Sequence, residues 1–426
     1  MPLLPKAETL KMIIKQLVPK EYVQIFSNRN FLILALTNLF TQLATAFLVL
    51  TLIVSAFLLT KNNFAVSGVV ISLAMPAFLL MALAGVIADI FDRKKVILGA
   101  ILYIAFVVFL ILTSISSIAA LISLAFFYNA GSSFLIPAIS AGTGQLVNKS
   151  KLQIANSIFV FTLAGGQVLG LFLASIVHFF FGNQITLLVA QGLLLVSLWL
   201  AWMLPSLIPV RKPEIADSII KTLKDIGRAF LYIFSQKIIW IFFIILAFMQ
   251  ALVAFGATLG PGFFDEVIGL SINKSPIFVL PFIGLGVIIG SFFSHNPKFR
   301  ESFLVKAGFE TIGFSAFILG IILRFNLLKN LLLLLPVAVF LVSVGFGVVV
   351  CVIAARTVLQ KKVAHSYQGT VFGAAIVLSA FLASIFSVMG AAIEAIWGYV
   401  TILIFVGLLF SLTLFAFEYL GKRWKL

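Results

Sequence analysis

Long apolar stretches separated by short polar segments run through almost the whole chain. Each has the length of about 18 or more residues that an α-helix needs to cross a bilayer. They predict twelve membrane-spanning helices, near residues 31–59, 65–88, 96–114, 117–139, 154–180, 185–204, 238–262, 276–294, 303–324, 330–353, 368–393 and 397–418. Because a bilayer offers no water to unpaired backbone groups, runs of this length select helices. The sequence therefore predicts an all-α polytopic membrane protein.

Lys and Arg residues are unevenly distributed over the segments between these spans. One side of the membrane holds both termini, alternate loops and 25 of the 29 basic residues, whereas the other side holds Lys61, Lys274, Arg324 and Lys329. Basic residues concentrate on the cytoplasmic side, so we expect both termini in the cytoplasm. The net charge of +16 is scattered over short segments, which argues against nucleic-acid binding and for contact with anionic membrane lipid.

Composition leads to the same class of protein. Of the 426 residues, 62% are hydrophobic and only 10% are charged, whereas a soluble domain carries about 25% charged residues. The outer surface must therefore meet lipid, and we expect a multi-pass protein of the cell membrane. The single cysteine, Cys351, excludes a disulfide framework.

The longest polar interval divides the predicted spans into six and six. Residues 205–237 are amphipathic and basic, and we expect them to form a cytoplasmic linker along the membrane surface. The predicted domains are thus a six-helix bundle over 31–204 and a second over 238–426. Residues 1–30 are expected to be a cytoplasmic interfacial segment. The stretches at 131–146 and 345–360 resemble each other, as in transporters built from a duplicated half.

Residues 85–95, GVIADIFDRKK, join the second and third spans with a dense charge cluster. A glycine at Gly85 would let neighbouring helices approach, Asp89 could cap a helix or pair with a charge, and Arg93 and Lys94 could anchor the loop at the headgroups. The simpler interpretation is a basic cluster that only fixes topology. The spacing of Gly85 and Asp89 favours a functional role.

This loop resembles the G-x-x-x-D-x-x-G-R-K signature of the major facilitator superfamily, with Ile90 and Asp92 as departures. Residues 136–158, IPAISAGTGQLVNKSKLQIANSI, and YQGTVFG at 367–373 are similar to the drug-efflux branch that includes macrolide efflux proteins. The resemblance is strongest over 31–180 and implies two six-helix bundles that rock about a central cavity.

Small residues at four-residue spacing occur within several predicted spans. Gly166 and Gly170 lie in the fifth span, and Gly286 and Gly290 lie in the eighth. Such stripes permit close helix contact, although they are common in any helical membrane protein.

Polar residues inside the spans are few. In the first span Asn38, Thr41, Gln42 and Thr45 share one helical face, which should turn away from lipid, and they are candidates for the substrate cavity. Interhelical hydrogen bonding is the alternative for each of them. Further cavity candidates are Tyr128, Asn129 and Gln250.

Glu310 is the only acidic residue that lies well inside a predicted span. A carboxyl group there is a candidate for proton coupling, because removal from water favours its neutral form. An ion pair with Lys306, one turn earlier, is the alternative.

Catalytic and cofactor signatures are absent from the sequence. It contains no G-x-x-x-x-G-K-[ST] loop, and its three histidines and one cysteine are too widely separated to predict a metal site. We therefore expect that the protein is not an enzyme and needs no cofactor. We expect a monomeric secondary active transporter that exchanges a small-molecule substrate for protons. The 46 phenylalanines and few buried charges favour efflux of hydrophobic or amphipathic compounds. A lysophospholipid transporter is the alternative, and a non-transporting membrane receptor is the third.

Overall fold

The computed structural model describes residues 25, 27–114, 116–148, 151–209, 224, 227–228, 231–296, 299–328, 330–363 and 365–424. Most of the predicted interfacial segment over 1–30 and of the linker over 205–237 lies outside these residues. Within the described part, ten helices are long and apolar enough to cross a membrane. The prediction of an all-helical membrane protein is confirmed.

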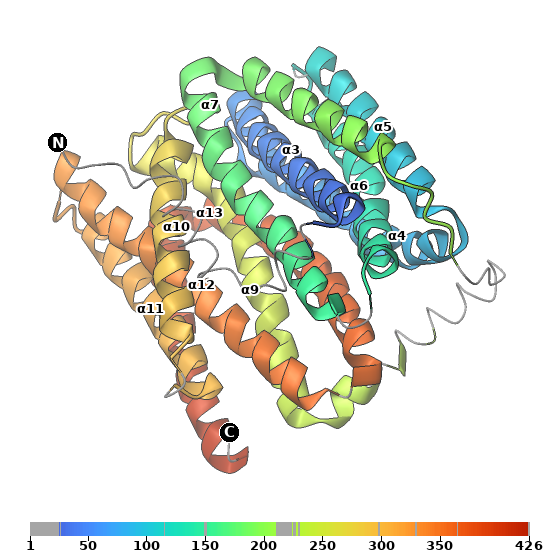
Figure 1. The fold of residues 1–426 in the computed structure, drawn as a ribbon. Coiled ribbons are helices and arrows are strands. Elements are labelled where there is room, and N and C mark those ends of the chain that lie inside the picture. The colour runs from blue at the N-terminus through green and yellow to red at the C-terminus, as the bar shows by residue number, and fades with distance from the viewer. Residues whose placement is uncertain are drawn as a thin grey trace, which may run out of the picture.

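Among the described residues, the N-terminal half has five helices, coloured blue to green in Figure 1. They are α3 (Arg29–Thr60), α4 (Asn63–Ile90), α5 (Arg93–Ser114), α6 (Ile118–Leu146) and α7 (Leu152–Trp202). Helix α3 packs most extensively against α7 and lies inside this half, so most of its residues are buried.

The C-terminal half begins with α9 and is coloured yellow to red. It contains α9 (Lys237–Gly262), the π-helix η2 (Phe263–Val267), α10 (Ser275–Ser294), α11 (Glu301–Arg324), the 3₁₀ helix η3 (Asn330–Leu333), α12 (Leu334–Lys362) and α13 (His365–Trp424). Its main packing pairs are α10 with α12, and α11 with α12 and α13.

Helices α7 and α13 each contain two of the predicted spans. The 51 residues of α7 would extend about 76 Å as a straight helix, whereas a bilayer core is about 30 Å thick. The chain turns instead at Gly182, where φ is 73° and ψ is −173°. Gly398 of α13 has nearly the same conformation, with φ 73° and ψ 166°, which a residue with a Cβ rarely adopts. The ten helices therefore hold the twelve predicted spans.

The predicted span boundaries differ from the helices at two inner ends. Helix α6 continues to Leu146, beyond the predicted end at 139, and α12 runs from Leu334 to Lys362, beyond 353. An apolar run marks only the part of a helix that lies in lipid. The helix itself can extend beyond the bilayer, because its backbone hydrogen bonds also form in water.

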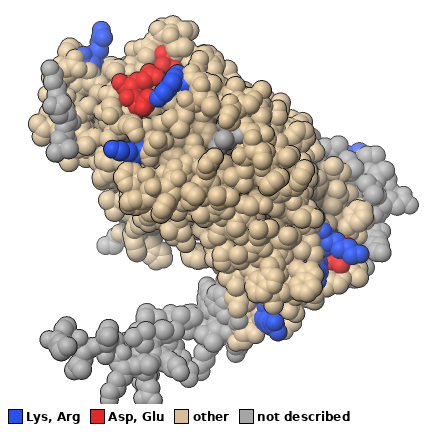
Figure 2. Space-filling view, turned by 90° about the horizontal axis from the view of Figure 1, so that it is seen from above, with Lys and Arg blue, Asp and Glu red and all other residues tan. Residues whose placement is uncertain are grey.

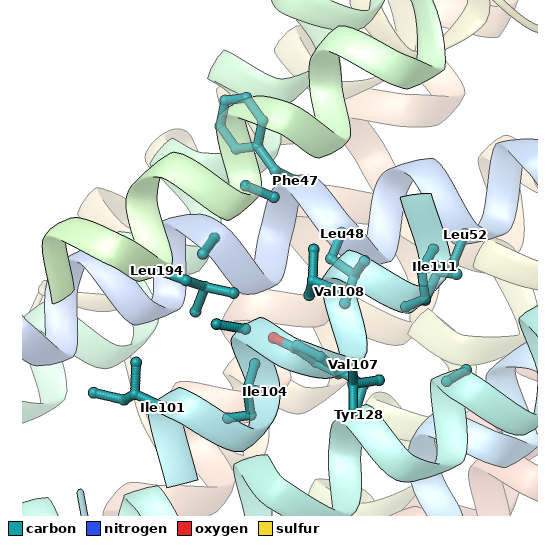
Figure 3. Close-up of a cluster of buried hydrophobic side chains, with 14 of the residues drawn as sticks. Phe47, Leu48, Leu52, Ile101, Ile104, Val107, Val108, Ile111, Tyr128 and Leu194 are labelled. Atoms are coloured by element: carbon teal, nitrogen blue, oxygen red, sulfur yellow. The ribbon is translucent and has the colours of Figure 1, made fainter. Parts of the chain in front are cut away.

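A large apolar cluster fills most of the N-terminal half. Figure 3 shows Leu48 and Leu52 of α3, Ile104 and Val108 of α5 and Tyr128 of α6 converging in it. Charged side chains lie at the two ends of the molecule in Figure 2, and the visible surface between them is a broad belt without charge. This belt is the surface that lipid would cover.

Candidate functional site

The two halves are bonded at one end of the molecule. We call it the outer end because it carries Lys61, which the basic-residue pattern places outside. Lys61 ends α3 in a left-handed conformation with φ 50° and ψ 36°, and Asn62 starts α4 by accepting a hydrogen bond from the backbone N–H of Phe64. This tight turn presents Lys61 Nζ to Asp265 Oδ2 of η2 at 2.7 Å.

Asn63 makes the most enclosed contact between the halves. Its side chain is 2% exposed, and its Nδ2 donates to Glu394 Oε2 at 2.9 Å and to Tyr399 Oη at 2.6 Å. Glu394 and Tyr399 lie on either side of the Gly398 turn of α13. Gly262, at the end of α9, lies against the same tyrosine hydroxyl, where a Cβ would overlap it. Three outer segments of the C-terminal half thus meet the start of α4.

These outer contacts differ in what they contribute. Lys61 is 57% exposed in its ion pair with Asp265, and exposed pairs contribute little, about 0–1 kcal/mol. Asn63 is enclosed, so separating its amide from its partners without water would be more costly. Asp265, Glu266 and Glu394 also concentrate negative charge beside one lysine.

Direct hydrogen bonds and ion pairs that join a described residue of one half to a described residue of the other lie at this end. A ring contact between Phe78 and Phe381, with centroids 6.5 Å apart, lies about halfway along α4 and the first segment of α13. The described residues therefore hold the two halves together at the outer end.

The charged loop after α4 bonds within the N-terminal half. Arg93 Nε donates to the carbonyl of Ala88 at 3.1 Å and Nη1 to that of Ala141 at 3.3 Å, so its charge faces carbonyls near the ends of α4 and α6. Asp89 is exposed and adds an electrostatic contact with Arg93. The expectation that Gly85 permits close helix packing is wrong in this conformation, because a Cβ there would meet no atom within 4 Å.

Asp92, one of the departures from the signature, holds this loop in place. It accepts hydrogen bonds from Ser206 Oγ at 2.6 Å, from the backbone N–H of Leu207 at 2.9 Å and from that of Lys94 at 3.0 Å. Partial burial raises the pKa of Asp92, but these hydrogen bonds and the charge of Lys95 together bring it below the usual value. The carboxylate therefore links the loop to the chain that follows α7.

We expect Asp92→Ala to loosen the link between the loop and residues 206–207. The melting temperature in detergent should fall by a few degrees at neutral pH, since three accepted hydrogen bonds are lost. Because the folded-state pKa is lowered, this contribution is present above the ordinary aspartate pKa and disappears as the pH falls through the lowered value. Asp89→Asn, on an exposed side chain of the same loop, serves as the control for stability. Equal melting temperatures for Asp92→Ala and the unaltered protein would contradict the link.

The polar face of α3 forms hydrogen bonds inside the N-terminal half. Asn38 Nδ2 donates to Thr162 Oγ1 at 2.8 Å, and the hydroxyls of Thr41 and Ser197 lie 2.7 Å apart. Both partners belong to α7, one to each segment, so the two segments flank α3.

The remaining two residues of this face are bonded in the same way. Gln42 Oε1 accepts from Gln167 Nε2 at 3.1 Å, and Thr45 Oγ1 accepts from Tyr128 Oη at 2.7 Å. These contacts favour the interhelical alternative for all four residues of the face. Gln167 is itself exposed, so one amide of this set is open to a ligand.

The comparisons with known proteins were made on sequence and on structure. The family model of the Major Facilitator Superfamily matches residues 31–388. The chain belongs to this superfamily. It is therefore a secondary transporter of small molecules and not an enzyme. No curated protein sequence matches it.

Solved structures of transporters share its fold. The nucleoside transporter NupG is 15% identical with a TM-score of 0.68, covering 91% of this chain and 99% of its own. A POT family transporter in complex with a thioalcohol conjugated peptide is 13% identical with a TM-score of 0.71, covering 93% and 96%. The human organic anion transporter TETRAN is 17% identical with a TM-score of 0.62, covering 94% and 100%. At these identities the likeness is one of fold alone.

The other cavity candidates of this transporter occupy different surroundings. Tyr128 is 1% exposed in the core of the N-terminal half, and Asn129 Nδ2 donates to the carbonyl of Leu73 on α4. Gln250 of α9 is exposed. It lies 13 residues after the first residue of α9, as Gln42 does in α3, so the two halves carry a glutamine at the same distance from the start of a helix.

The small-residue stripes of the transporter lie at close helix contacts. A Cβ at Gly166 would be 2.9 Å from Gln42 Cβ, and one at Gly170 would be 2.7 Å from Ala46 Cβ, so the fifth span packs directly on α3. Gly286 and Gly290 of α10 lie against the backbone and side chains of α12.

Glu310 lies away from the contact between the halves. Its exposed side chain lines a groove on α11 and α12, and α11 packs against α12 and α13 of its own half. Figure 1 shows α11 at the edge of the molecule, far from α5 and α6. The role of Glu310 in proton coupling remains a prediction. The structure places the residue on an outward-facing groove and not between the two halves.

Sequence reasoning missed the outer contact. Its members come from the ends of α3, α4 and η2 and from the turn inside α13, and Asn63 and Tyr399 are more than 300 residues apart in the sequence. The available signal was a concentration of acids on the outer side: Asp265, Glu266 and Glu394 directly follow or end predicted spans.

Proposed function

We propose that the protein is a proton-coupled exporter of hydrophobic or amphipathic small molecules, working by alternating access. The observation that supports it most is that the bonds between described residues of the two halves lie at the outer end, where Lys61 pairs with Asp265 and Asn63 bonds to Glu394 and Tyr399. In a fold of two rocking bundles, such an arrangement loads substrate from the cytoplasmic side.

The substrate class follows from what the first span leaves free. Its polar face is occupied by hydrogen bonds to α6 and α7, so few charged or hydrogen-bonding groups remain for a sugar or phosphate ligand. Exposed Gln167 and Gln250 offer amides at mid-span, and their surroundings are apolar. An uncharged or weakly polar pocket binds amphipathic molecules through burial of apolar area.

The acidic residues at the outer end could accept the coupling protons. For export, the outer contact must open after loading, and a proton arriving from outside would meet Glu266 and Glu394 first. The amide of Asn63 donates to the carboxylate of Glu394, and a hydrogen bond to a charged group is stronger than one to a neutral group. A proton that reaches this cluster of acids would therefore weaken the outer contact.

Transport in proteoliposomes tests the proposal. With a pH gradient imposed, we expect the protein to move a labelled amphipathic drug against its concentration gradient, and not without the gradient. Labelled lysophospholipid should stay in place. Movement of the lysolipid instead would establish the alternative substrate, and movement of neither compound under any gradient would reject export of this class.

A further inference from the structure

The lipid-facing surface carries two grooves, one in each half. The first, of about 450 Å³, lies between α5 and the second segment of α7 and is lined only by glycine, leucine and tryptophan. The second, of about 760 Å³, lies between α11 and α12 and includes Ser411 of α13. Its volume is that of a small-molecule site. The first groove is therefore apolar, whereas the second also contains polar side chains.

The second groove combines a carboxylate with hydroxyls that are free to accept. Glu310 lines it together with Thr311, Ser315, Ser343 and Ser411. The hydroxyls of Thr311, Ser315 and Ser411 each donate to a carbonyl of their own helix. Their protons are thus used, and what they present to the groove is oxygen lone pairs. The polar side of the groove is therefore rich in hydrogen-bond acceptors and carries one carboxyl group.

Glu310 lies at an unusual position for a carboxyl group, because it is far from the inner membrane surface. It lies nine residues after Glu301, the first residue of α11, hence about 14 Å further along the helix axis. Glu301 pairs with Lys361 at 2.6 Å, where the inner surface supplies a basic partner. An exposed carboxylate at mid-membrane depth is costly unless it is neutralised or paired. No lysine or arginine is among the described residues that line this groove.

We propose that the groove between α11 and α12 is a binding site for a small amphipathic amine that enters from the bilayer. The ammonium group donates to Glu310 and the hydroxyl oxygens, and the alkyl part lies along Phe314, Leu335 and Val339, which are exposed on the groove. Paired in this way, the carboxylate remains charged at its depth. The site is independent of whether the amine is then transported.

A phospholipid headgroup fits this groove poorly. An aminophospholipid carries a phosphate next to its amine, and the described lining offers that phosphate no cation. A simple alkylamine has no such charged group to leave unpaired. The absence of a cation from the described lining therefore favours a small-molecule amine.

Photolabelling of the reconstituted protein tests the site. The probes are a long-chain alkylamine with a diazirine in its chain and the alcohol of the same length, applied at pH 7 to phosphatidylcholine vesicles. Mass spectrometry should find α11 and α12 peptides labelled about tenfold more by the amine than by the alcohol, the difference expected for one charged hydrogen-bonded contact. Peptides of the α5 and α7 groove should be labelled equally by both.

Three variants make the result specific. Glu310→Gln should reduce amine labelling of α11 and α12 to the level of the alcohol, and Glu301→Gln, which removes an acid outside the groove, should leave it unchanged. Val339→Trp fills the groove and should reduce labelling by both probes. Equal labelling by amine and alcohol, or full amine labelling of Glu310→Gln, would overturn the proposal. Competition by added phosphatidylethanolamine would overturn the choice of a small-molecule amine.

Discussion

Gly262→Ala is expected to disfavour closure of the outer end and to lower transport by about 5- to 150-fold, the range that a strain of roughly 1–3 kcal/mol in the closed state would give. A methyl group there overlaps the hydroxyl of Tyr399 and comes within 3.0 Å of Asn63 Oδ1 and of the Phe57 ring. Moving the tyrosine breaks its hydrogen bond with Asn63. The halves then lose their most enclosed contact while the fold of each is kept.

Spin-label distances measure this effect directly. In a Cys351→Ser background, labels on Phe64→Cys and Ser271→Cys report the separation of the halves at the outer end. The distance should lengthen in Gly262→Ala and stay unchanged in Gly260→Ala, whose Cβ meets nothing within 4 Å on the same helix. An unchanged distance and normal transport in Gly262→Ala would show that the outer contact does not control the conformation.

Gly286→Ala is expected to destabilise the C-terminal half by about 3 kcal/mol, the upper part of the usual range for overpacking. Its methyl group would overlap the carbonyl oxygen of Val342 and lie 2.8 Å from the backbone nitrogen of Phe346. Backbone atoms cannot rotate away as side chains do, so α10 and α12 would have to separate. Gly345 of α12 meets the Ile283 carbonyl in the same way from the other side.

Thermal unfolding in detergent measures this second effect. We expect a lower melting temperature and a reduced yield of folded protein for Gly286→Ala, and neither change for Gly284→Ala, two residues away and with nothing within 4 Å of its Cβ. Equal stability of the two variants would mean that α10 and α12 can separate at little cost.

Glycines show how far sequence patterns reach in this protein. Gly166, Gly170, Gly286 and Gly290 lie at four-residue spacing on helices that pack within one half, and all four face a neighbouring helix closely. Gly85 of α4 faces open space. Periodicity predicts contacts within a half, but it holds no information on which end of the molecule is closed.

The partners of polar residues are harder to predict from sequence than the positions of membrane spans. Apolar runs mark spans because lipid acts on every residue of a run alike. The α3 face illustrates the limit, since its spacing predicts that Asn38 and Thr41 turn away from lipid and cannot distinguish a ligand from Thr162 and Ser197 as their partners. The outer contact was beyond prediction because its members meet only when both halves are assembled.

The turns at Gly182 and Gly398 determine where the protein can be reached from outside. Each is a single non-helical glycine at which the chain reverses between two helical segments, so the fifth and sixth spans, like the eleventh and twelfth, are joined without an extended loop. Proteases, antibodies and inserted epitope tags all need a stretch of chain outside a helix. Residues 268–274, between η2 and α10, form a longer connection of this kind than 115–117 or 325–329, and an epitope placed there would report orientation in intact cells.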